Sequence, residues 1–292
     1  MTGITSPPPH APQLPMITSP TLWLIFINVA VAVLMALQGI DPVSPTPREL
    51  IDWGGNLGAY TLTGEWQRLL YSMFLHGGAL HLALNMFLLF QIGRVSEAAW
   101  GRLRFLMIYL VTGLFGGFAS AWWNANEAVQ ALNGLPPQLA FMMLAPNMVV
   151  SIGASGALLG AAGALLVHTF RAGQDAKVDL GIILQVVLLN IGMGFLIDGT
   201  DNAAHVGGAL SGIVIGACLL QPREGMSRFG LRLQAAGVFA LMLLVLGGLM
   251  RHAVPANLGP VAAAFRKAEA AADRRAALKR EHANDKAGLR RP

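Results

Sequence analysis

The chain has 292 residues, of which 54% are hydrophobic and 12% are charged, with a formal net charge of +5. Charged residues make up about 25% of a typical soluble domain, so this composition excludes an ordinary soluble globular protein and favours an integral membrane protein. We expect a polar N-terminal tail over residues 1–20, one membrane domain over 21–250 and a basic C-terminal tail over 251–292.

Long stretches without Asp, Glu, Lys or Arg recur along the chain. A transmembrane helix needs about 20 apolar residues to cross a hydrocarbon core of about 30 Å. Each stretch has room for one such helix, which predicts an all-α membrane protein with a seven-transmembrane helical bundle. The charge-free stretches are 1–40, 69–93, 105–126, 128–170, 180–197, 202–222 and 233–250.

Basic residues are distributed unevenly between the two sides that such a bundle would have. Eight fall on one side, against two, Arg48 and Arg68, on the other. Because cytoplasmic loops carry the excess of Lys and Arg, we expect an integral multi-pass protein of a bacterial inner (plasma) membrane with a cytoplasmic N-terminus. The eight residues are Arg94, Arg102, Arg104, Arg171, Lys177, Arg223, Arg228 and Arg232.

The C-terminal tail holds ten of the twenty basic residues, and an odd number of spans places it outside the cell. From about residue 258 to 285 the tail is rich in Ala, with interspersed charges, a composition that favours helix. This helix would either lie on the membrane surface as a basic helix or extend into solvent, partly frayed.

Polar residues gather in the second stretch, where His76, His81 and Asn85 follow one another at short intervals. His81 and Asn85 are four residues apart, so they project from one face of a helix. Polar groups inside a bilayer are costly and normally face the bundle interior, where they mark functional sites. We expect both residues in the outer half of this helix.

Ser155 and His205 are each framed by small residues inside apolar stretches, the serine within Gly153-Ala154-Ser155-Gly156. A stripe of small residues at every fourth position follows each of them. Such stripes let transmembrane helices approach closely. If the two stripes face each other, Ser155 and His205 come within hydrogen-bonding distance. The stripes are Gly156, Gly160 and Ala164 in one stretch and Gly208, Gly212 and Gly216 in the other.

These residue types suit hydrolysis of an amide. A serine hydroxyl becomes an effective nucleophile when a neutral imidazole accepts its proton. The resulting oxyanion needs preorganised donors, such as an Asn amide, an imidazole N–H or a backbone N–H. Asp198 and Asp201 precede the His205 helix, but a buried carboxylate carries a desolvation cost, so we favour a two-residue Ser155–His205 dyad. The residues indicate an intramembrane hydrolase.

The ordered set of motifs over roughly residues 60–220 resembles the rhomboid family of intramembrane serine proteases. A short G-x-S-G motif alone is weak, but the whole set, in this order and on the right helices, is highly specific. The matching segments are the Trp–Arg element Glu65-Trp66-Gln67-Arg68, the His76, His81 and Asn85 pattern, Glu97, the G-x-S-G motif 153–156, and the histidine helix from Asp201 to His205 with its glycine stripe.

The resemblance implies Ser155 as nucleophile, His205 as general base, and His81 and Asn85 as oxyanion-hole donors. It implies a six-helix core with one C-terminal helix added, a membrane-dipping first loop over 41–66, and a gate and cap formed by the fifth span and residues 198–202. Leu159 stands where many members carry an aromatic ring on the catalytic imidazole. The implied supporting residues are His76, Arg68, Glu97, Gly153, Gly156 and Gly208.

The resemblance also implies single-span membrane proteins as substrates, cut in or near their transmembrane segments in the lipid bilayer, with small residues favoured at the cut. It implies no cofactor, no metal ion and no nucleic-acid partner. Two alternatives remain. One is a catalytically inactive rhomboid-like scaffold that binds transmembrane clients, which would typically lack the serine or the histidine. The other is a channel or metal transporter with His76, His81 and His205 as ligands. The spans lack the carboxylates that usually complete such a metal site, which argues against this alternative.

Overall fold

A computed structural model describes residues 19–131, 149–173, 178–196, 201–219 and 227–286. Predictions for residues 1–18, Lys177, Asp198 and Arg223 therefore lie outside the described residues. Within the described residues the regular elements are helices, and one isolated β-bridge pairs Asn56 with Ser151. The helices are α1 (Pro20–Leu37), α2 (Pro47–Asp52), α3 (Gly58–Thr61), α4 (Arg68–Tyr71), the 3-10 helix Ser72–Phe74, α5 (Ala79–Trp100), α6 (Arg102–Ala131), α8 (Ser155–Ala172), α9 (Leu180–Leu196), α10 (Asn202–Cys218), α11 (Arg228–His252) and α12 (Leu258–Lys286).

Each predicted stretch contains a helix, but the helices differ in their capacity to cross a bilayer. Among the described residues, four helices are long and apolar enough to do so: α1, α5, α6 and α11. The apolar segments of α9 and α10 are shorter, over Leu180–Asn190 and Asn202–Cys218. The chain is thus an all-helical, multi-pass membrane protein, and the count of seven spans stays a prediction.

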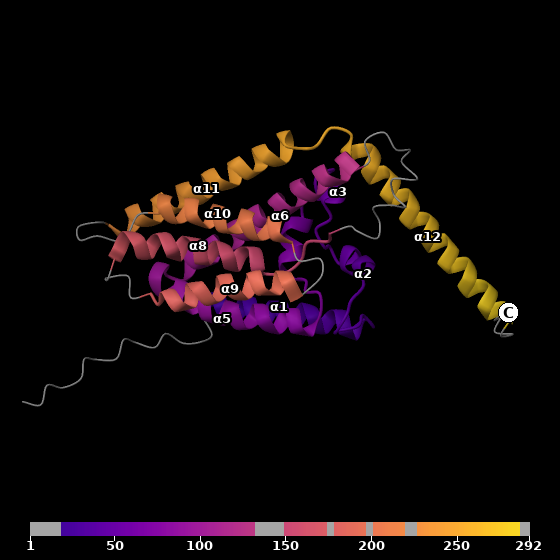
Figure 1. Cartoon of the computed structure of the whole chain (residues 1–292), viewed down its shortest axis with the longest axis horizontal. Helices are drawn as coiled ribbons and strands as arrows, with labels where there is room; N and C mark the ends of the chain where they lie inside the picture. The colour runs from indigo at the N-terminus through magenta and orange to yellow at the C-terminus, as the bar shows by residue number, and fades with distance from the viewer. Residues whose placement is uncertain (1–18, 132–148, 174–177, 197–200, 220–226, 287–292) are drawn as a thin grey trace, which may run out of the picture.

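Helices α6, α8 and α10 form the centre of the bundle (Figure 1). Helix α8 is buried from Ser155 to Leu165, whereas α1 and α11 expose large apolar side chains such as Phe26 and Leu244 on their outer faces. An apolar face exposed on this scale suits contact with lipid. Helix α8 is thus shielded by its neighbours, whereas α1 and α11 lie at the surface of the bundle.

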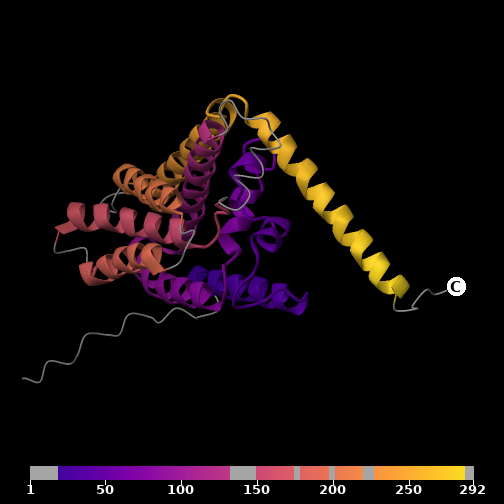
Figure 2. The same cartoon turned by 45° about the vertical axis from the view of Figure 1, so that its right-hand side comes forward.

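The two ends of the bundle differ in chemistry. At one end, Arg171 donates to the carbonyl oxygen of Ala217 at 2.7 Å, at the C-terminus of α10, where the helix dipole favours a cation. At the other end, α2 and α3 lie in the long connection between α1 and α5, and α12 starts beside α3 and extends away from the bundle (Figure 2). The C-terminal tail is helical, as its composition favours, but its first turns pack on α3 and α6, which neither alternative anticipated.

Candidate active site

Ser155 and His205 meet at the end of the bundle near α2 and α3. Ser155 is the first residue of α8, and His205 lies in the first turn of α10. Nε2 of His205 lies 2.8 Å from Oγ of Ser155, and the two side chains are 6% and 9% exposed. This hydrogen bond joins a hydroxyl and an imidazole in the geometry that activation of a serine would need.

The close approach of α8 and α10 brings these two side chains together. A Cβ on Gly208 would collide with the carbonyl oxygen of Gly156, and a Cβ on Gly212 with that of Gly160. The stripes of small residues on the two helices thus face each other backbone to backbone. Because both stripes begin within a turn of Ser155 and His205, the interhelical distance fixes the distance between their side chains.

The residues before Ser155 are held in place by backbone hydrogen bonds. Gly153 has φ +106°, a conformation that side chains other than hydrogen disfavour, and a Cβ there would lie 3.0 Å from the His81 ring. Its N–H donates to the carbonyl oxygen of Ser72 at 2.9 Å. Ser151 and Asn56 exchange backbone hydrogen bonds of 3.0 and 3.1 Å. The first loop therefore forms one wall beside the serine.

His81 presents a proton to this site. The N–H of Gly77 donates to Nδ1 of His81 at 3.2 Å, so the neutral ring carries its own proton on Nε2. His81 and Gly153 both line the cavity at the dyad. His76 packs edge-on against His81 with ring centroids 5.1 Å apart, and no hydrogen-bond partner is found for either of its nitrogens among the described residues. His76 therefore touches the site through His81.

Asn85 lies one turn farther along α5 than His81 and is 1% exposed. Its Nδ2 donates to the carbonyl oxygen of His81 at 3.0 Å, which leaves the second N–H of the amide available. Asn85 is not among the described residues that line the cavity. Of the two predicted oxyanion donors, His81 is thus at the cavity and Asn85 lies behind it.

Asp201 caps α10 and does not extend the dyad. Its carboxylate accepts a hydrogen bond from the N–H of Ala204 at 3.1 Å, as an N-cap residue does. The described residues show no hydrogen bond between this carboxylate and the ring of His205. This arrangement fits the two-residue dyad expected from the sequence.

A cavity of about 250 Å³ adjoins the dyad. Its walls include apolar side chains such as Leu50 and Val150. Its polar lining residues are Ser72, His81, Ser151, Ser155, Asp201 and His205. Helix α8 begins here without a side-chain cap, and the first N–H groups of a helix have no partner within it. Such N–H groups are ready donors for a negative charge. Among the described residues, no group of three His, Cys, Asp or Glu side chains is placed to hold a metal ion.

Two predicted supporting residues lie away from the dyad. Arg68 donates through Nη1 to the carbonyl oxygens of Ile51 and Gly55 at 2.7 and 2.9 Å, which ties the first loop together. Glu97 lies 16 residues after His81 on α5, about 24 Å along the helix axis. Its Oε1 accepts hydrogen bonds from Ser19 and Thr21 at the N-terminus of α1. Both residues brace the scaffold.

The residues that connect the first loop to the site were not predicted from the sequence. Asn56 pairs with Ser151, its side chain donates to the carbonyl oxygen of Gly117 at 2.8 Å, and Ser72 accepts from Gly153. Most of these hydrogen bonds use backbone atoms, so no pattern of residue types indicates them. The Asn56 side chain, polar in an apolar neighbourhood, was the one available signal.

Comparison with known proteins identifies the family of the chain. The family model of the rhomboid domain matches residues 63–222, more than half of the chain. The rhomboid protease GluP of Bacillus subtilis (strain 168) is 32% identical over 218 residues, which cover 74% of this chain and 38% of GluP. The rhomboid protease AarA of Providencia stuartii is 31% identical over 216 residues, 70% of this chain and 74% of AarA. The chain belongs to the rhomboid family.

Proposed function

We propose that this protein is an intramembrane serine endopeptidase that hydrolyses peptide bonds in or near the transmembrane segments of single-span membrane proteins. The observation that carries the proposal is the 2.8 Å contact between Oγ of Ser155 and Nε2 of His205 inside an otherwise apolar bundle. Membership of the rhomboid family supports membrane proteins as the substrate class. Seven spans, with the dyad toward the outer face, complete the proposal.

In the proposed mechanism, Nε2 of His205 accepts the proton of Ser155 as Oγ attacks the substrate carbonyl carbon. His205 then returns this proton to the departing amine, and a water molecule hydrolyses the acyl-enzyme by the same route. The N–H of Ser155 and Nε2–H of His81 are the nearest donors for the oxyanion. In this proposal the free N–H of Asn85, one turn farther along α5, is a third donor when substrate is bound.

The test uses a single-span reporter reconstituted with the purified protein in liposomes. Ser155→Ala and His205→Ala should each reduce cleavage to background, and the double variant should be no worse, because the two residues act as one unit. Asn85→Ala should retain slow turnover, reduced by about 10²–10³-fold, as at comparable sites when one donor is removed.

The inactive-scaffold alternative makes a different prediction in the same assay. A serine-directed phosphonate would leave Ser155 of a scaffold unlabelled, and the wild-type protein would bind the reporter without cutting it. Full cleavage by Ser155→Ala would refute the serine-protease mechanism. Full cleavage by Asn85→Ala would preserve the dyad but remove Asn85 from the oxyanion hole.

A further inference from the structure

Helix α12 starts at the end of the bundle at which the dyad lies, beside α3, and its later part extends away from the bundle (Figures 1 and 2). Burial holds its first turns in place. Leu258, Ala262 and Phe265 are at most 3% exposed and share an apolar cluster with Tyr60 of α3 and Ala125 of α6. The helix is therefore docked on the protein by its own apolar face.

Charged side chains of α12 bind residues in and beside the first loop. Arg266 pairs with Glu65 at 2.9 Å, and its guanidinium carbon lies 5.2 Å from the centroid of the Tyr60 ring. Glu269 accepts a 2.5 Å hydrogen bond from the Tyr60 hydroxyl and pairs with Arg48 at 3.2 Å. Burial and the Glu269 carboxylate raise the pKa of Tyr60 above its ordinary value, so the phenol remains a donor at neutral pH.

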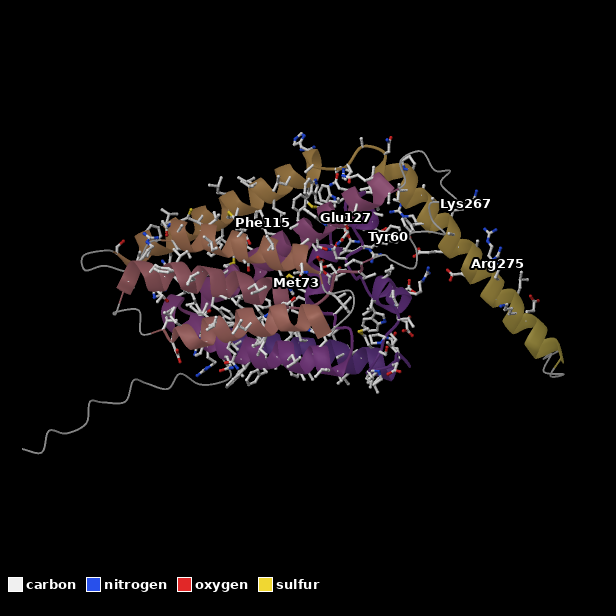
Figure 3. The ribbon with its side chains drawn as sticks, in the orientation of Figure 1. Tyr60, Met73, Phe115, Glu127, Lys267 and Arg275 are labelled. Carbon is white, nitrogen blue, oxygen red and sulfur yellow. The ribbon has the colours of Figure 1, made fainter. Side chains whose placement is uncertain are left out.

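The other face of α12 is different. Lys267 and Arg275 project away from the bundle, whereas Tyr60 lies between α12 and the bundle (Figure 3). Isolated exposed ion pairs contribute little to stability, but several pairs that share the buried Tyr60 form a connected network. The ion pairs and the hydrogen bond of Arg266 and Glu269 thus lie on the loop-facing side of α12.

The first loop, which α12 contacts, is connected to the active site by further hydrogen bonds. Glu65, the partner of Arg266, also binds Nε of Arg68 at 2.7 Å. Arg68 holds the carbonyl oxygens of Ile51 and Gly55, on either side of the turn before Asn56. Asn56 pairs with Ser151, four residues before the nucleophile. A continuous series of hydrogen bonds and ion pairs therefore connects α12 with the cavity wall.

We propose that Arg266 and Glu269 are positioning residues for the active site, through which α12 acts as a strap that holds the first loop against residues 149–153. The inference rests on the proposed protease function, because the wall being positioned belongs to the substrate cavity. The dyad itself is held by the contact of α8 with α10. Loss of the strap should therefore raise KM and leave kcat nearly unchanged.

The test compares the full-length double variant Arg266→Ala/Glu269→Gln with the control Arg274→Ala/Glu281→Gln. The control makes the same chemical changes at exposed residues of the same helix. With the single-span reporter in liposomes, we expect KM to rise on the order of 10-fold in the first variant, the loss typical of hydrogen bonds to charged groups. We expect the control to match wild type.

Hydrogen exchange measured by mass spectrometry gives a readout that does not depend on activity. Peptides covering residues 53–58 and 149–155 should exchange faster in Arg266→Ala/Glu269→Gln than in the control, while peptides within α8 should not change. Unchanged KM and unchanged exchange in these two peptides would overturn the strap. If the wild-type protein failed to cleave any reporter, the protease proposal would fail, and the exchange comparison would still decide whether α12 holds the loop.

Discussion

The backbone contact between α8 and α10 predicts that a single methyl group at Gly208 disables the protein. A Cβ at this position would collide with the carbonyl oxygen of Gly156. The obstacle is backbone, so no side-chain rotation can relieve it, and the helices must separate by on the order of 1 Å. A displacement of about 1 Å at a catalytic contact can cost about 10²-fold in rate. Overpacking of this kind also costs about 1–3 kcal/mol of stability.

We therefore expect Gly208→Ala to cleave a single-span reporter about 10²-fold more slowly than wild type and to unfold at a lower temperature. The matched control is Gly237→Ala on α11, where a Cβ meets nothing within 4 Å. That change should leave the rate unaltered and add about 0.4–1 kcal/mol of stability by restricting the unfolded chain. A wild-type cleavage rate and an unchanged thermal midpoint in Gly208→Ala would show that the distance between α8 and α10 does not control the contact between Ser155 and His205.

Three further predictions concern other parts of the fold. Glu97→Ala should lower the free energy of unfolding by about 1–3 kcal/mol, because it leaves the donors at the start of α1 without their acceptor; an unchanged thermal midpoint would contradict this. Gly153→Ala should slow phosphonate labelling of the serine by about 10-fold or more, since φ is positive and the new methyl group contacts His81; equal labelling rates would count against this role. In a Cys218→Ser background, Ala277→Cys should react with an impermeant thiol reagent in intact cells, and protection until lysis would place α12 on the cytoplasmic side.

The residues of the dyad could be chosen from the sequence because their signal is local. The four-residue period of the glycine stripes matches the helical repeat, so the phase of each stripe relative to Ser155 or His205 is readable without a structure. The spacing of His81 and Asn85 likewise indicates one helix face. It does not indicate depth, and the structure places His81 at the cavity but Asn85 one turn behind it.

Composition alone determined that the chain is a helical membrane protein, because a bilayer requires apolar segments of a set length. It did not settle the number of spans, because among the described helices α1, α5, α6 and α11 are long and apolar enough to cross a bilayer, whereas the apolar segments of α9 and α10 are shorter.

The connections between distant segments were decided only by tertiary structure. Arg266 and Glu65 are 201 residues apart, and Tyr60 and Glu269 are 209 residues apart. In the sequence, a charged residue of the basic tail looks the same whether its side chain faces solvent or pairs with another residue. The Asn56–Ser151 pairing uses backbone atoms that every residue possesses, so it leaves no mark in the sequence. The sequence by itself therefore determined which groups carry the proposed chemistry, and the folded chain decided what holds them in position.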